Sequence, residues 1–183
     1  MDTIRTKRLA IRNFQADDWQ ALQKMVVKYA ASEYGAYDHQ WPEGDEATKG
    51  VAERFASGNS FLAVCLADTG TFIGFVVLNS EDEAGKAINL GYIFDSDYHG
   101  QGYASEACQA ALERAFVALG AERIVTGTAA ANQPSCRLLE RLCFHKTGEG
   151  LGSSKNAPDG TPIEFVGYSF AISKDEWSAA KQG

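Results

Sequence analysis

The sequence predicts one domain of the mixed α/β (α+β) class. Its 183 residues, 45% hydrophobic and 22% charged, suffice for a single domain with a substantial core. Short segments typical of strands alternate along the chain with segments of helical periodicity. A glycine-containing run, Tyr98–Ala107, joins one such strand to a helix. Read in order, the segments give β-α-α-β-β-β-α-β-α-β-β.

The first third of the chain predicts a strand and two helices. Residues 9–12 alternate as a strand does, and Asp17 and Asp18 are placed to cap the helix that follows. Asp45 is placed to cap a second helix, which ends near residues 57–58. The residues expected on the buried faces are Trp19, Leu22, Val26 and Tyr29 on the first helix and Ala47, Val51 and Phe55 on the second.

Between these helices, residues 33–44 form a loop dense in aromatic rings and carboxylates. Loops of this composition often line binding sites. The rings could equally cover the edge of the core, so both interpretations stay open. The residues of interest in this loop are Glu33, Tyr34, Tyr37, Asp38 and Trp41.

The middle of the chain predicts a hairpin, a strand and a helix. Residues 60–67 and 72–79 are rich in β-formers and flank a turn at residues 68–71. Residues 87–94 form the next strand, and the helix from Ala104 is stopped by Gly120. The residues expected on its buried stripe are Ala107, Cys108, Ala111, Ala115 and Leu119.

The last third predicts a strand at 123–128, a helix and a closing strand at 163–172. The helix starts at Asn132-Gln133-Pro134-Ser135, where proline in the first turn costs no hydrogen bond. It carries Leu138, Leu139 and Leu142 and ends at Cys143-Phe144. Residues 150–160 are polar and predict a loop.

The glycine run between the strand at 87–94 and the following helix predicts an anion site. Gly100 and Gly102 allow backbone angles that other residues resist, and they let the main chain approach a ligand closely. The N–H groups of the turn and the positive end of the helix dipole then favour a phosphate or pyrophosphate.

Composition argues against several classes of protein. A net charge of -7 disfavours a nucleic-acid surface. No apolar stretch approaches 18 residues and the first residues lack a signal-peptide core, so we expect a cytoplasmic protein without a membrane partner. His39, His99 and His145 are too scattered to suggest a metal site. The cysteines, which are expected to be buried free thiols, are Cys65, Cys108, Cys136 and Cys143.

Four blocks together resemble the GNAT superfamily of acetyl-CoA-dependent N-acetyltransferases. They are Thr6–Arg12, Asn89–Tyr92, Gly100–Ala107 and Asn132–Phe144. The resemblance covers nearly the whole chain and is closest to the RimJ/RimL-like branch, which includes ribosomal-protein alanine N-acetyltransferases. It implies a mixed, mostly antiparallel central sheet with flanking helices, in which two central parallel strands splay apart around coenzyme A.

The resemblance also implies where acetyl-CoA binds. Its pyrophosphate would lie on the amides of Gln101, Gly102, Tyr103, Ala104 and Ser105 at the helix start. The pantetheine arm would pair with the main chain of Ile93 and Phe94 as an added strand does, and Asn132 would bind the pantetheine amides. Ser135 lies where the family places a hydroxyl close to the thioester sulfur. No metal is implied.

Three residues depart from the family's pattern. His99 stands where many members carry Arg or Gln, and Cys143 replaces the usual glycine before Phe144. Leu139 stands where many relatives have the tyrosine that protonates the leaving thiolate. Ser135 is therefore the candidate proton donor.

The acceptor side is predicted from the loop at 33–44. Glu33 or Asp38 is a candidate base acting through water, and the sequence does not choose between them. The aromatic residues expected to bind a cationic acceptor are Tyr34, Tyr37, Trp41 and Tyr92.

The predicted function is direct transfer of the acetyl group from acetyl-CoA to a primary amine within a ternary complex. The amine could be a protein N-terminus, a lysine, or a small amine of the polyamine or aminoglycoside type, and the enzyme a monomer or homodimer. A different class of function is a non-catalytic acyl-CoA sensor or interaction module, which the absent tyrosine permits. Catalysis by Cys136 and a dinucleotide-binding Rossmann site are disfavoured, because no histidine is placed to pair with the cysteine and the glycine spacing is wrong.

Overall fold

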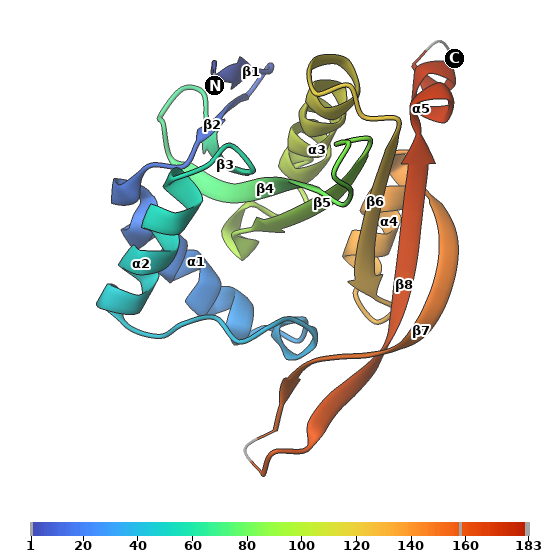
Figure 1. Cartoon of the computed structure of the whole chain (residues 1–183). Helices are drawn as coiled ribbons and strands as arrows, with labels where there is room; N and C mark the ends of the chain where they lie inside the picture. The colour runs from blue at the N-terminus through green and yellow to red at the C-terminus, as the bar shows by residue number, and fades with distance from the viewer. Residues whose placement is uncertain (1, 158, 182–183) are drawn as a thin grey trace. The chain divides into compact units, whose positions relative to one another are not determined.

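In the computed structural model of the protein, residues 2–157 and 159–181 are described. They divide into two compact units whose segments interleave along the chain (Figure 1). Unit 1 contains residues 2–32, 41–78 and 91–111, and unit 2 contains residues 33–40, 79–90 and the described residues from 112 onward. The prediction of a single domain stays a prediction.

Unit 1 is built from five strands hydrogen-bonded in chain order, β1-β2-β3-β4-β5, the last of which it shares with unit 2. Neighbouring strands from β1 to β4 are antiparallel. The strands are β1 Ile4–Arg5, β2 Leu9–Asn13, β3 Phe61–Leu66, β4 Phe72–Ser80 and β5 Ala87–Phe94. The predicted strand at 9–12, the hairpin and the strand at 87–94 are confirmed, whereas the two residues of β1 were too few to show a pattern.

Two helices pack side by side in unit 1, α1 Trp19–Ala30 and α2 Asp45–Ala56 (Figure 1). They bury one core with the sheet, centred on Phe14, Phe55 and Phe75, whose rings meet edge to face or tilted. Aromatic residues bury large apolar areas and dominate such cores. Both predicted helices are therefore confirmed.

The predicted helix caps are wrong in detail. The Asp18 carboxylate does not cap α1; it accepts two hydrogen bonds from the Arg12 guanidinium, each 2.7 Å long, and one from the Gln15 N–H. Asp45 is the first residue of α2, and Gly44 occupies the cap position. Ala47 is exposed, because Thr48 takes the buried position and its hydroxyl donates to the Gly44 carbonyl.

Unit 2 contains the first half of β5 and three further strands, in the order β5-β6-β8-β7. Strands β5 and β6 pair in parallel from Ala87↔Arg123 to Asn89↔Val125, whereas β6 pairs antiparallel with β8 along its full length. The fold is thus a mixed, mostly antiparallel sheet with flanking helices, as predicted. The elements are β6 Arg123–Ala129, α4 Gln133–Arg141, β7 His145–Asn156, β8 Pro162–Ser173 and α5 Lys174–Ala180.

The predicted polar loop at residues 150–160 is wrong, because residues 150–156 belong to β7. They pair with β8 in register, for example Gly150↔Gly167 and Leu151↔Val166. Most of β7 is exposed, so it lacks the apolar alternation that marks a half-buried strand. Position 158 lies outside the described residues. The closing helix α5 was not predicted.

The helix after the glycine turn, α3 Tyr103–Glu113, continues as a π-helical turn over Arg114–Ala118. Phe116, within this wider turn, is buried, and Leu119, which follows it, is 45% exposed, contrary to the predicted stripe. Gly120, with φ +72°, ends the helix as predicted. Cys143 also differs from prediction: it is exposed and adopts φ +64°, whereas the other three cysteines are buried.

None of the described helices combines the length and apolar character that crossing a bilayer demands.

Candidate active site

The glycine turn of unit 1 has the geometry expected of an anion site. Gly100 and Gly102 adopt φ +73° and +81°, the left-handed region that glycine tolerates best. No hydrogen bond between described residues uses the N–H groups of residues 101–105, and the first bonded amide of α3 is Glu106, which donates to the Gly102 carbonyl at 3.1 Å. Five donors therefore gather at the positive end of the helix dipole.

A side-chain cluster flanks this turn. Arg8, directly before β2, donates from Nε to Glu106 Oε2 at 2.7 Å and from Nη1 to the Gln101 carbonyl at 2.9 Å. Its guanidinium also lies 4.4 Å from the centre of the Tyr103 ring. Thr6 donates its hydroxyl to the same Glu106 carboxylate at 2.6 Å. The sequence marked Arg8 only as part of a matching block, since its partners are more than 90 positions away.

The end of β5 adjoins the turn along the chain. His99 directs its Nε2 to the Phe94 carbonyl at 3.0 Å, so this carbonyl already has a partner and the His99 ring is held back toward β5. Tyr92 packs against Phe94, with ring centres 6.5 Å apart. The pairing of Ile93 and Phe94 with a ligand stays a prediction.

Lys28 of α1 fixes the connection between β5 and the turn. Its Nζ lies 2.6 Å from Asp97 Oδ2 and 3.0 Å from Asp95 Oδ1. The hydrogen bonds to Asp97 and then Asp95 raise the pKa of Lys28. The segment that carries the turn is thus tied to the β1–β2 connection through Arg8 and to α1 through Lys28.

Helix α4, in unit 2, starts where the sequence predicts, and Asn132 caps it. Asn132 Oδ1 accepts the Ser135 N–H at 3.2 Å, and proline stands in the first turn. Because this oxygen is engaged, Asn132 has its Nδ2 to offer a ligand. Leu139 is fully buried and serves the core. Burial also raises the pKa of Cys136, which keeps this thiol protonated and agrees with a structural role.

Residues 33–40, the part of the predicted acceptor loop that lies in unit 2, are anchored to the β7–β8 hairpin of the same unit. Lys155 Nζ donates to the Gly35 carbonyl at 2.6 Å, and Ser154 Oγ donates to the Tyr37 carbonyl at 3.0 Å. The Tyr37 ring meets Phe165 edge to face, with centres 5.5 Å apart. These contacts give a polar segment a fixed conformation that its own sequence did not show.

The carboxylates of this segment have close partners. Asp38 Oδ1 lies 2.8 Å from His39 Nδ1 and also accepts a hydrogen bond from the His39 N–H. This pairing of two adjacent side chains was not predicted from the sequence. A hydrogen bond to Glu33 raises the pKa of the Tyr34 hydroxyl. Trp41, by contrast, is 8% exposed and belongs to the core of unit 1, where it packs on Phe75.

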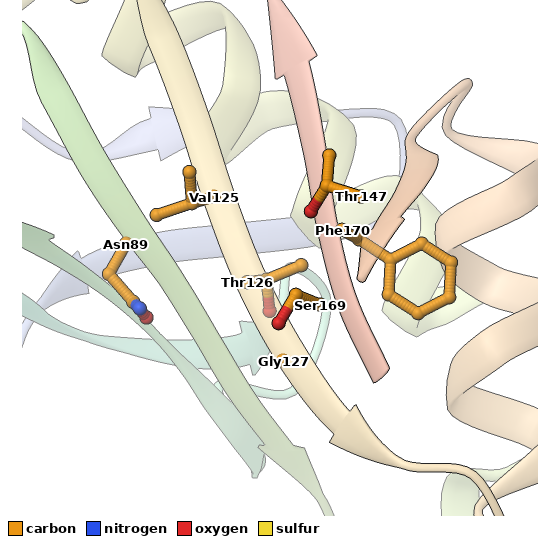
Figure 2. A pocket seen from close by; sticks show the side chains of 7 residues that line it. All are labelled: Asn89, Val125, Thr126, Gly127, Thr147, Ser169 and Phe170. Atoms are coloured by element: carbon orange, nitrogen blue, oxygen red, sulfur yellow. The ribbon is translucent and has the colours of Figure 1, made fainter. Parts of the chain in front are cut away.

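Unit 2 also holds an open pocket of about 380 Å³ over β5, β6, β7 and β8 (Figure 2). Its lining has no charged side chain and consists of Asn89, Val125, Thr126, Gly127, Thr147, Ser169 and Phe170. The register places Gly127 and Gly148 opposite Ser169, one on each side, so neither neighbouring strand has a side chain beside this serine. Among the residues of the described ranges, no group of three or more His, Cys, Asp or Glu side chains is arranged to hold a metal ion.

Comparison with known proteins identifies the family. The family model described as an acetyltransferase (GNAT) domain matches residues 8–145 of this chain. The chain is 30% identical over 179 residues to the uncharacterized N-acetyltransferase YnaD of Bacillus subtilis (strain 168), covering 96% of this chain and 99% of that relative. It shares 25% identity and a TM-score of 0.81 with the solved structure of a GNAT-family acetyltransferase from Bacillus anthracis, covering 95% of this chain and 99% of that chain.

A more distant structure shares the fold alone. It is a mutant of a spermidine N-acetyltransferase from Vibrio cholerae, 16% identical, with a TM-score of 0.76, covering 96% of this chain and 99% of that chain.

Proposed function

Because the chain belongs to the GNAT acetyltransferase family, we propose that it transfers the acetyl group of acetyl-CoA directly to a primary amine in a ternary complex. The observation that carries this proposal is the row of N–H groups at residues 101–105, which have no partner among the described residues and lie at the start of an 11-residue helix. A pyrophosphate supplies the acceptors that this row lacks.

The remaining coenzyme contacts are proposed from the family resemblance. In unit 1 the main chain of Ile93 and Phe94 pairs with the pantetheine arm, which shares the Phe94 carbonyl with His99. In unit 2 Asn132 binds a pantetheine carbonyl through Nδ2, and Ser135 lies beside the sulfur. The matched family domain, residues 8–145, includes segments of both units, which supports their working as one domain.

The proposed reaction needs a neutral amine, a polarised thioester carbonyl and a proton for the leaving sulfur. The amine nitrogen attacks the carbonyl carbon, a C–N bond forms and the C–S bond breaks. A main-chain N–H near Ile93 or Phe94 stabilises the developing oxyanion. Glu33 or Asp38 takes the amine proton through water, and the Ser135 hydroxyl gives a proton to the thiolate. Positioning supplies most of the rate.

The proposed acceptor is an amine that is cationic in solution and loses a proton at the site before it attacks. Two carboxylates, Glu33 and Asp38, and the rings of Tyr34 and Tyr37 lie on a segment that the β7–β8 hairpin holds in place. The four sequence blocks favour the RimJ/RimL-like branch and a protein N-terminus, whereas the spermidine enzyme shows that the same fold serves a polyamine. A lysine side chain is the third candidate.

Calorimetric titration with coenzyme A tests the proposed site. In Gly102→Val the new side chain at φ +81° displaces the turn, and affinity is expected to fall at least tenfold. Gly70→Val is the matched control, because Gly70 has a similar φ of +71° in the β3–β4 turn of the same unit. Equal affinity in the parent and Gly102→Val would remove the turn from the site.

A further inference from the structure

We infer that Arg8 is a positioning residue for the coenzyme pyrophosphate: it diverts Glu106 from the start of α3 and holds the phosphate-binding turn by the Gln101 carbonyl. The inference rests on the proposed function, since it concerns the same turn. It adds a role for the connection between β1 and β2, which the coenzyme contacts implied by the family resemblance leave out.

Glu106 poses a problem for an anion site. It is the acidic residue in the first turn of α3, four residues after Gly102. A carboxylate in the first turn of a helix is attracted to the positive end of the helix dipole, and its charge repels a phosphate there. An undiverted Glu106 would therefore compete with the ligand for the same N–H groups.

The structure shows how the carboxylate is turned away. Its two oxygens accept from Arg8 Nε at 2.7 Å, from the Arg8 N–H at 2.9 Å and from the Thr6 hydroxyl at 2.6 Å. Three charge-assisted hydrogen bonds fix its direction and satisfy much of its acceptor capacity. The guanidinium neutralises the charge, so the amides at residues 101–105 face a ligand without a competing anion.

The remaining nitrogens of Arg8 reach the turn itself. Nη1 donates to the Gln101 carbonyl at 2.9 Å, which directs this peptide group so that its carbonyl faces Arg8. Nη2 lies 3.4 Å from the place that a Cβ atom on Gly102 would occupy. The planar guanidinium bonds Glu106 and the turn at the same time, a geometry that lysine does not reproduce.

The test compares two thioesters that differ in the pyrophosphate. Acetyl-CoA carries it, and S-acetyl-pantetheine lacks it together with the nucleotide. In Arg8→Met we expect kcat/KM for acetyl-CoA to fall at least tenfold and that for acetyl-pantetheine to change less than twofold. Arg5→Met is the matched control: it removes the same charge from an exposed arginine of β1 and is expected to affect neither substrate.

A second variant separates positioning from folding. Adding Glu106→Gln to Arg8→Met removes the competing charge, so affinity for coenzyme A, measured by calorimetry, is expected to recover at least threefold relative to Arg8→Met alone. If Arg8→Met does not fold, Arg8→Lys replaces it, with a smaller loss expected for acetyl-CoA alone.

The outcomes are distinct. A parent protein that binds no coenzyme A overturns the proposed function. A parent that binds coenzyme A while Arg8→Met keeps its affinity overturns this inference alone. Equal losses for both thioesters would show a general structural role for Arg8 and also overturn it, as would a double variant no better than Arg8→Met.

Discussion

Gly74 of β4 approaches Ile93 of β5 so closely that a Cβ atom on Gly74 would lie 2.5 Å from the Ile93 carbonyl oxygen and 2.9 Å from the Phe94 Cα. No real side chain occupies such a space. The β3–β4 register shifts between Val64 and Cys65, directly opposite this glycine. An irregularity of β4 therefore coincides with the place where β5 reaches the proposed coenzyme site.

Gly74→Ala is accordingly expected to move the end of β5. We expect a loss of about 1–3 kcal/mol in the free energy of unfolding, typical of overpacking, together with weaker binding of coenzyme A. Urea unfolding and calorimetry measure the two effects. Gly150→Ala is the control, because a Cβ there meets nothing within 4 Å. Gly74→Ala with parental stability would contradict the close approach.

The environment of Glu106 makes stability depend on pH. Burial opposes its ionisation, but the hydrogen bonds from Thr6 and Arg8 outweigh this and lower the Glu106 pKa below its ordinary value of 4.5. The carboxylate therefore stabilises the fold above the unfolded-state pKa, and this contribution is lost as pH falls through the lowered pKa. The difference in unfolding free energy between parent and Glu106→Gln should be full at pH 6 to 7 and shrink below about pH 4. A difference that stays constant over this range would refute the assignment.

Replacement of Cys143 by glycine is expected to raise the stability of the protein. It follows α4 with φ +64°, and a residue with a Cβ atom is strained there. Because the side chain is exposed, little packing is lost in Cys143→Gly. We expect a gain of about 0.5–1 kcal/mol and a higher Tm in calorimetric melting. A lower Tm would mean that the cysteine makes a contact worth more than the strain.

The acceptor segment is tested by removing its charges one at a time. Glu33→Gln and Asp38→Asn are expected to raise the acceptor KM or lower kcat by about tenfold each, with the KM for acetyl-CoA unchanged. Asp38→Asn also weakens the pairing with His39. Glu53→Gln, at an exposed acid of α2 outside the loop at 33–44, is the control. Parental kinetics in both variants would leave the segment with a covering role only.

Ser135 is expected to act in turnover and not in coenzyme binding. Ser135→Ala should lower kcat by roughly 10²-fold, the low end for loss of a general acid. Coenzyme binding should change little, because the N–H of residue 135 still donates to Asn132 Oδ1. Ser135→Thr keeps a hydroxyl and should retain most of the activity. Near-parental kcat in Ser135→Ala would assign the proton to water or another group.

Local signals allowed much of the fold to be predicted. The strand at Ala87–Phe94, the helix start at Asn132 and the stop at Gly120 each depend on a few neighbouring residues, and the structure confirms them. The predicted element order ended on two strands, but the bounds of β7 were not predicted, because this strand is exposed along most of its length and carries glycines where a core strand would alternate. Leu119 was misplaced because no sequence signal announced the π-helical turn before it.

The candidate site, like the fold, was predicted only where its residues are close in sequence. The glycine turn was visible because its residues are contiguous. The other contacts join positions about 100 residues apart or more, and only the folded chain brings them together. They are the hydrogen bonds from Arg8 to the turn and Glu106, and those from Ser154 and Lys155 to residues 33–40. Their partners are carbonyls and a carboxylate, which leave no recognisable pattern in sequence.

The central claim is most directly tested by following free thiol release from acetyl-CoA with a panel of amines: peptides with free N-termini, lysine peptides and polyamines. We expect the parent protein to release thiol in step with acetylation of at least one amine, as mass spectrometry of that amine would show. Saturable binding of acetyl-CoA without amine-dependent thiol release from any member of the panel would contradict catalysis and favour an acyl-CoA sensor.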